Sequence, residues 1–254
     1  MKSSHIYFAI VLCISATVSL AQGVFEINSA CADSGCFSGD NPVTDTIEIS
    51  ADSGTYRLTS DLVYDTNNVP AILVDPTDVQ GVVTIDLNGY TIEFNGIPSA
   101  GDNAIEIVDN NTIVTIKNGS ITRFNDGIVA TGGSTVIVEN MVFRIMNDDA
   151  IVASSGTIRN NVFDGNGFGI FSPNPGGSVL GDRLYIESNL FLDDTAGQDP
   201  VASLANTNYC KDNVIGYGGG SSNFDACTLA GTNLCDNAAC TTNRTSDGNS
   251  VDEK

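Results

Sequence analysis

The chain has 254 residues, 41% of them hydrophobic, which is enough for one large domain with a sizeable core. Ten Lys and Arg against 31 Asp and Glu give a formal net charge of -21, which argues against binding to nucleic acid or to an anionic membrane. The single histidine, His5, lies in a segment that we expect to be removed, so a Ser-His-Asp triad, a His-ligated zinc site and a His general base are excluded.

Residues 1–21 have the pattern of a secretory signal peptide. Lys2 precedes an apolar run over residues 6–20, and Ser19 and Ala21 are the small residues expected before a cleavage site. A membrane-anchoring helix is the alternative, but the run is short for a span and contains Ser and Thr. No second run of that length follows, so we expect a secreted protein, extracellular or periplasmic, with no membrane span in the mature chain.

Export would place the remaining cysteines in an oxidising compartment, where disulfides are the default. Cys13 leaves with the signal peptide, and six cysteines remain: Cys31, Cys36, Cys210, Cys227, Cys235 and Cys240. We expect Cys31 and Cys36 to form a local pair in an N-terminal segment and cap, residues 22–44. The cysteines near the other end should stabilise a C-terminal segment, residues 221–254, that ends in a disordered tail. A Cys-rich metal site is the alternative, but the spacing lacks a Cys-x-x-Cys pair.

Residues 45–220 contain an internal repeat of short strands. Five segments align, namely residues 115–121, 137–143, 157–163, 185–191 and 209–215, and residues 84–92 fit with one extra residue. A second column of strands begins at Ala71, Ala104, Gly127, Ala150, Gly169 and, less well, Val201. The equivalent residues Asn118, Asn140 and Asn160 recur at intervals of about twenty residues. This period predicts one superhelical turn per repeat.

Such repeats are too small to bury their own apolar faces, so they must stack, at a strand spacing of about 4.8 Å. The sequence therefore predicts an all-β solenoid, a parallel β-helix of about six to seven rungs. One inner column should contain Ile116, Val138, Ile158, Ile186 and Cys210, and the next Ile121, Phe143, Phe163, Phe191 and Ile215. Asn161, Asn189 and Asn213 fall at one position, where their amides would form a structural ladder of hydrogen bonds.

Three motifs give the chain a family resemblance: residues 56–60 (Tyr-Arg-Leu-Thr-Ser), residues 83–89, and Asn-Asn-Val-Phe at 160–163. With the Gly-Ile strand starts, they resemble the secreted right-handed parallel β-helix proteins of the pectate-lyase-like superfamily, over residues 45–220. The similarity is to uncharacterised bacterial members that also carry a short Cys pair before the first rung. The resemblance implies a right-handed coil. It does not select among lyases, hydrolases, epimerases and non-catalytic binders.

Two outward-facing columns describe the expected surface. The charged column Asp86, Lys117, Glu139, Arg159, Glu187 and Lys211 alternates in sign. The column Leu73, Glu106, Val129, Val152, Phe171 and Ser203 is largely apolar. In catalytic relatives, as the resemblance implies, this sheet presents carboxylates, Lys and Arg to bound sugar. The difference favours a non-catalytic module that binds extracellular polysaccharide or a surface partner.

The corner before each Ala-Ile or Gly-Ile strand is rich in Asp and Asn. These residues are Asp102, Asn103, Asn125, Asp126, Asn147, Asp148, Asp149, Asp164, Asn166, Asp193, Asp194 and Asp199. Carboxylate oxygens suit Ca²⁺, and Asp126, Asp148 and Asp149 form the closest-spaced set, so calcium is the cofactor that this edge would take. Solvated turns are the alternative interpretation.

Arg123 and Arg144 lie just upstream of that set. A β-elimination lyase of the family type uses Ca²⁺ to acidify a uronate proton and a basic side chain, often Arg, to remove it, as the resemblance implies. Arg123 and Arg144 are therefore the candidate catalytic residues of the alternative function, a Ca²⁺-dependent polysaccharide lyase or other carbohydrate-active enzyme.

Overall fold

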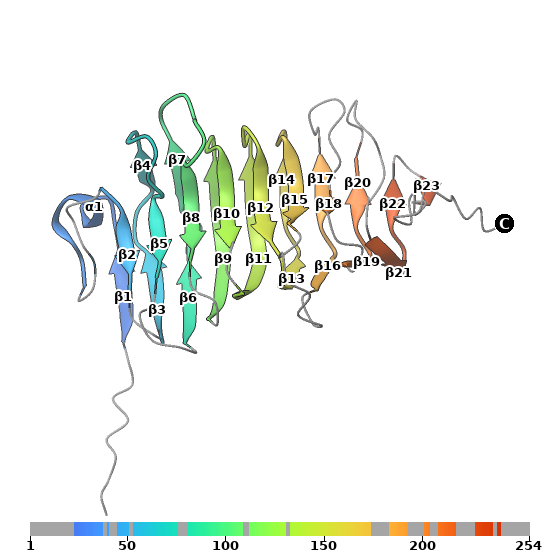
Figure 1. Ribbon diagram of the computed structural model, residues 1–254, viewed down its shortest axis with the longest axis horizontal. Helices are drawn as coiled ribbons and strands as arrows, with labels where there is room; N and C mark the ends of the chain where they lie inside the picture. The colour runs from blue at the N-terminus through green and yellow to red at the C-terminus, as the bar shows by residue number, and fades with distance from the viewer. Residues whose placement is uncertain are drawn as a thin grey trace, which may run out of the picture.

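The computed structural model describes residues 23–37, 40, 45–50, 53–75, 81–108, 112–130, 133–173, 183–192, 201–203, 208–216, 227–235 and 238–239. Short strands follow one another along the long axis of the molecule, from the N-terminal to the C-terminal end (Figure 1). They form three parallel walls around one core. The expected signal peptide, residues 1–21, lies outside the described residues.

The first wall contains the longest series of paired strands. Its members are β1 (Val24–Ile27), β3 (Ser53–Leu58), β6 (Val82–Asp86), the first halves of β9 (Ile113–Thr122) and β11 (Thr135–Arg144), β13 (Gly156–Arg159), β16 (Leu184–Glu187), β19 (Asn208–Lys211) and β21 (Cys227–Ala230). Every pair is parallel and in register. The stacked strands thus continue beyond the expected limits of residues 45–220 at both ends.

The second wall lies beyond a sharp corner. Its members are β4 (Leu62–Tyr64), β7 (Thr91–Phe94), the second halves of β9 and β11, β14 (Val162–Asp164), β17 (Leu190–Leu192), β20 (Val214–Ile215) and β22 (Leu234–Cys235). The final strand, β23 (Ala238–Ala239), pairs antiparallel to β22. Because β9 and β11 run through the corner unbroken, the first two walls form one continuous sheet.

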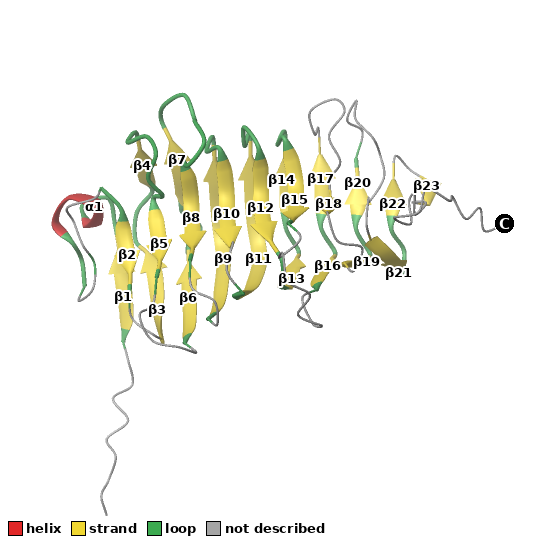
Figure 2. Ribbon diagram, in the orientation of Figure 1, coloured by secondary structure: helices red, strands yellow, loops and turns green. Residues whose placement is uncertain are grey.

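The third wall is a separate sheet of seven parallel strands, which matches the expected six to seven rungs, whereas nine of the described strands stack in the first wall. Its members are β2 (Ile47–Ile49), β5 (Ile72–Val74), β8 (Asn103–Ile107), β10 (Asp126–Ala130), β12 (Asp149–Ala153), β15 (Phe168–Ser172) and β18 (Val201–Ser203). Strands account for nearly all of the regular structure drawn in Figure 2, and α1 (Cys31–Ser34) is the helix at the N-terminal end.

The core is built from columns of like side chains, as the repeat predicts. Ile116, Val138 and Ile158 are consecutive register partners and are fully buried. In the second wall the rings of Phe143, Phe163 and Phe191 stack, with centroids 5.2 and 4.6 Å apart. Burying three aromatic side chains in one column is a large source of apolar stabilisation for the central rungs.

The corner between the first and second walls requires a left-handed backbone. Asn118, Asn140 and Asn160 occupy it with φ values of 60°, 55° and 56°. Asn tolerates this region better than most residues because its short polar side chain bonds locally. Ser188 and Asp212 occupy the same position in later rungs. The repeated Asn is therefore explained by backbone conformation.

Buried asparagines follow this corner and are joined along the stack. The backbone N–H of Asn161 donates to Oδ1 of Asn189 (3.0 Å), and its amide donates to the carbonyl of Val138 (3.0 Å). Asn189 donates in the same way to Oδ1 of Asn213 (3.0 Å). Asn213 donates to Asn233, which extends the series by one rung. Each amide satisfies backbone groups that the corner would otherwise leave buried and unpaired.

The cysteines support the two ends of the solenoid. Cys31 is bonded to Cys36, and Cys210 to Cys227. Cys235 is also disulfide-bonded, so the alternative of a Cys-rich metal site is wrong for these five residues. Within the described part of the chain, no helix is long and apolar enough to cross a membrane.

Candidate functional site

The three carboxylates singled out from the sequence meet at the corner that leads into the third wall. Asp126 begins β10 and Asp149 begins β12, and these two strands pair in parallel. Asp148 directly precedes Asp149 and is exposed. One carboxylate oxygen from each residue lies within 4.8 Å of the others. This separation is compatible with a single bound cation of the size of Ca²⁺.

Hydrogen bonds from backbone N–H groups and from asparagine side chains hold this acidic cluster (Asp126, Asp148 and Asp149) in place. Oδ1 of Asp126 accepts from the backbone N–H of Asp149 (3.0 Å), and Oδ2 accepts from the amide of Asn125 (2.9 Å). The N–H of Asp148 donates to the carbonyl of Asn125 (2.9 Å). The amide of Asn147 in turn donates to Oδ1 of Asn125 (3.0 Å). The loop is therefore an ordered hydrogen-bonded corner.

One oxygen of the acidic cluster has no partner. Asp149 is 8% exposed, and its Oδ1 makes no hydrogen bond within the described structure. A buried acceptor without a partner is costly and is the usual sign of a missing ligand, water or proton. Burial, then Asp148 and Asp126, raise the pKa of Asp149 to about 8. Burial likewise raises the pKa of Asp126. The cluster thus favours a bound cation or a bound proton.

The rung that follows Asp149 adds no carboxylate to the cluster, and Gly167 allows its backbone to pack closely against Asp148. A Cβ on Gly167 would lie 2.6 Å from the carbonyl oxygen of Asp148, closer than real Cβ contacts. The register partner of Asp149 in that rung is Phe168, which offers no oxygen ligand. The carboxylates are therefore confined to two adjacent rungs.

Other members of the expected acidic edge are used elsewhere. Asp102 is fully buried, and its carboxylate accepts hydrogen bonds from Ser99 and from the backbone N–H of Asn68. Asp164 pairs with Arg144. The carboxylates of these two residues are therefore engaged by partners outside the acidic cluster. Asp193, Asp194 and Asp199 lie outside the described residues.

The two candidate catalytic arginines occupy different positions in their rungs and are both ion-paired. Nη1 of Arg123 is 3.4 Å from Oε1 of Glu93, and Nε of Arg144 is 3.6 Å from Oδ2 of Asp164. Their side chains are 54% and 59% exposed. Each guanidinium is therefore turned toward a carboxylate of the second wall.

The outward column of the third wall is mainly apolar, and one of its assignments needs correction. Leu73, Glu106, Val129, Val152 and Phe171 are consecutive register partners. Four of them are half-buried, whereas Val129 is buried, with 9% of its surface exposed. The partner of Phe171 in the last rung is Ala202, so the alignment to Ser203 is wrong by one residue. Val201 is the register partner of Ile170, whereas the repeat had aligned it with Gly169.

The outward column of the first wall alternates in charge over more rungs than the repeat indicated. Its consecutive register partners are Glu26, Arg57, Asp86, Lys117, Glu139, Arg159, Glu187 and Lys211. The basic residues of this column therefore face acidic neighbours.

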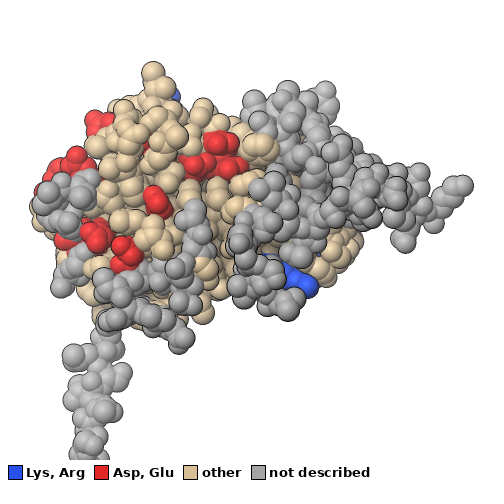
Figure 3. All heavy atoms as spheres, in the orientation of Figure 1, with Lys and Arg blue, Asp and Glu red and all other residues tan. Residues whose placement is uncertain are grey.

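Acidic side chains gather in several groups on the face shown in Figure 3, where basic ones are few.

Sequence reasoning missed two features. The first is Asn233, which continues the buried asparagine ladder. The turn before Asn233 is one residue longer than in the other repeats, so the alignment did not include it. The sequence Asn-Leu-Cys at 233–235 resembles the other repeats and could have identified it. A second acidic site lies at the N-terminal end, where Asp33, Asp45 and Asp65 line a cavity. These residues belong to non-repeating segments, so no pattern could bring them together.

Comparison with known proteins supports the parallel β-helix fold. A family model described as the right handed beta helix region matches residues 66–191, from the loop after β4 to the middle of β17. The expected right-handed parallel β-helix is therefore confirmed. No curated protein and no solved structure shows significant similarity to the chain.

Proposed function

We propose that the protein is a secreted, non-catalytic β-helix module that binds extracellular polysaccharide and holds Ca²⁺ at the acidic cluster. The observation that carries the proposal is the buried, unpaired Oδ1 of Asp149 beside two further carboxylates. Asp126, Asp148 and Asp149 would hold the ion. Its charge would offset their repulsion and would offer an electrophile to sugar hydroxyl or carboxylate oxygens.

Secretion is supported by two observations. Residues 1–21 have the composition of a signal peptide. The described cysteines are paired in disulfides, which persist in oxidising compartments.

The preference for binding over catalysis is supported by the arginines. A lyase needs a basic group free to accept a proton at the reacting carbon. Arg123 and Arg144 are each paired with a carboxylate on the second wall. The apolar outward column of the third wall, with the half-buried ring of Phe171, would instead offer a surface for the apolar face of a sugar ring.

A glycan array probed with the purified chain, with Ca²⁺ and with chelator, tests this proposal. We expect binding to a restricted set of polysaccharides, weakened by Phe171→Ala. Tyr185→Ala is the matched control, because Tyr185 is an exposed aromatic residue on the first wall. The absence of any bound glycan in the presence of Ca²⁺ would contradict the proposal.

A parallel assay addresses the lyase alternative. Uronate polymers are incubated with the protein, and the ultraviolet absorbance of unsaturated products is followed with and without chelator. We expect no increase. A Ca²⁺-dependent increase that Arg123→Gln or Arg144→Gln abolishes would replace the binding module with the enzyme.

A further inference from the structure

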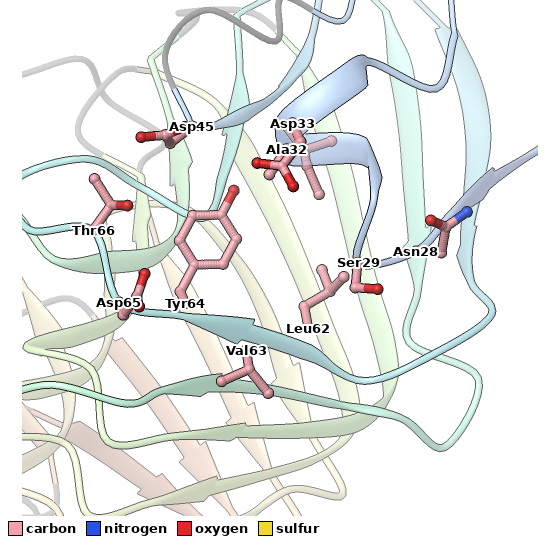
Figure 4. A pocket seen from close by; sticks show the side chains of 11 residues that line it. Asn28, Ser29, Ala32, Asp33, Asp45, Leu62, Val63, Tyr64, Asp65 and Thr66 are labelled. Carbon is pink, nitrogen blue, oxygen red and sulfur yellow. The ribbon is translucent and has the colours of Figure 1, made fainter.

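A cavity of about 200 Å³ opens at the N-terminal end of the solenoid, between α1 and the first rung. Asp33 reaches it from α1, Asp45 from the segment before β2, and Asp65 from the segment after β4 (Figure 4). Its apolar lining includes Ala32 and Leu62. The cavity is separate from the acidic cluster, which is formed by β10 and β12.

The cavity is acidic and lacks a compensating cation. Lys, Arg and His are absent from the described residues that line it. Asp33, Asp45 and Asp65 are exposed, and none of them takes part in an ion pair in the described part of the chain. Three carboxylates around one opening attract positive charge, at a strength that salt will reduce.

Tyr64 supplies an independent sign of a missing ligand. The residue is 6% exposed, and its buried hydroxyl makes no hydrogen bond of regular geometry within the described structure. The backbone N–H of Ile47 lies close to the hydroxyl, but it donates to the carbonyl of Ala71 (3.0 Å). Figure 4 shows the ring standing in the cavity, with the hydroxyl end turned toward Asp45 and Asp33. Burial, followed by the charges of Asp45, Asp40 and Asp33, raises the pKa of Tyr64, so the hydroxyl keeps its proton.

The walls of the cavity are tied together before any ligand arrives. The Cys31–Cys36 disulfide closes the segment that carries α1. The carboxylate of Asp40 accepts the backbone N–H of Cys36 (2.8 Å) and that of Glu48 (3.0 Å). These contacts fasten the α1 segment to β2, which reduces the cost of ordering the site on binding.

The arrangement of the carboxylates around the cavity favours an organic cation over a metal ion. Among the described residues, only the acidic cluster brings three ligand atoms close enough for one metal ion. In Figure 4 the ring of Tyr64 stands among the three carboxylates, and the aliphatic side chains of Leu62 and Val63 also line the cavity. A ligand that satisfies both the carboxylates and the apolar lining must combine a positive charge with a short carbon chain.

We propose that this cavity binds an alkylammonium cation. The ammonium group donates hydrogen bonds to Asp45, Asp33 and the hydroxyl oxygen of Tyr64. The carbon chain packs against the ring of Tyr64 and against Leu62. The same chemistry is present in a free diamine and in the lysine side chain of a protein.

Titration of the full chain by NMR, in the presence of chelator, tests the proposal with two probes. The first is 1,4-diaminobutane, and the second is Nα-acetyl-lysine amide. We expect saturable binding of at least one of them, weakened about tenfold by Tyr64→Phe, which keeps the ring but removes the hydroxyl. Asp45→Asn should weaken binding by a similar factor, and high salt should weaken it as well.

Two controls identify the site. Asp75→Asn removes one exposed negative charge outside the cavity and should leave binding unchanged. The double variant Asp148→Asn, Asp149→Asn should also bind as the wild type does, which separates this site from the proposed Ca²⁺ site. Tighter binding of the diamine identifies a free polyamine as the ligand, and tighter binding of the lysine derivative identifies a protein lysine. Failure of both probes to bind, or equal binding by the Tyr64 and Asp45 variants, would overturn the proposal.

Discussion

Arg159 and Glu139 form a two-pronged ion pair across adjacent strands of the first wall. Nη2 and Nε of Arg159 lie 2.6 and 2.9 Å from Oε2 of Glu139, and the two residues are register partners. On its other side Arg159 is paired in register with Glu187. This arginine therefore separates two carboxylates that would otherwise face each other at twice the strand spacing.

Arg159→Glu should destabilise the fold because it places three acidic residues on successive rungs. We expect a loss of about 0.5–2 kcal/mol in the free energy of unfolding at low salt. Denaturant unfolding measures it, and high salt should reduce the difference. Arg159→Gln, which removes the pair without adding repulsion, should lose less. Unchanged stability of Arg159→Glu at low salt would contradict the role of the charged column.

Phe163→Ala should leave a cavity in the middle of the aromatic column. Phe163 is fully buried and its ring stacks on both neighbours, so its truncation should cost about 3–5 kcal/mol. Thermal or denaturant unfolding is the measurement. The control is Tyr185→Ala, at a residue that is half exposed, and we expect less than about 1 kcal/mol there. Similar losses for the two variants would show that the column is not the core.

The sequence predicts the rungs well because every rung must bury the inward-facing apolar side chains of short strands by stacking on its neighbours. The register from Ile116 through Val138 to Ile158 follows from alternation and period alone. The candidate site is less predictable, because a corner side chain can turn either toward its neighbours or into its own loop. Asp102 turns toward Ser99, whereas Asp149 turns toward Asp126 and Asp148. The cavity around Tyr64 lies beyond sequence prediction, because it joins the first strands of the second and third walls to the α1 segment, which has no counterpart in the repeat.

The metal-free protein should lose stability as the pH rises from about 4 to about 8. The pKa of Asp149 is raised to about 8 in the folded state, from an ordinary value of 3.8, so the folded state binds the proton more tightly. The resulting stabilisation is fully present below the ordinary pKa and disappears as the pH passes through the raised one. Melting temperatures measured in chelator across this range check it.

Asp149→Asn should flatten this pH dependence, because the amide stays neutral in both states. Asp75→Asn removes the same formal charge at an exposed position and should leave the slope unchanged. Equal slopes for the wild type and Asp149→Asn would show that this carboxyl does not titrate in that range.

Ca²⁺ should stabilise the protein through the acidic cluster. An ion bound by Asp126, Asp148 and Asp149 only in the folded state raises the free energy of unfolding by mass action, by about 2.7 kcal/mol at a hundredfold excess over its dissociation constant. The double variant Asp148→Asn, Asp149→Asn should retain the fold and lose this increment. As a control, Asp75→Asn should keep the increment, because Asp75 follows the end of β5 whereas the cluster lies where β10 and β12 begin. Calorimetric titration measures the binding directly, and heats equal to dilution at millimolar Ca²⁺ would remove the metal site together with the lyase alternative.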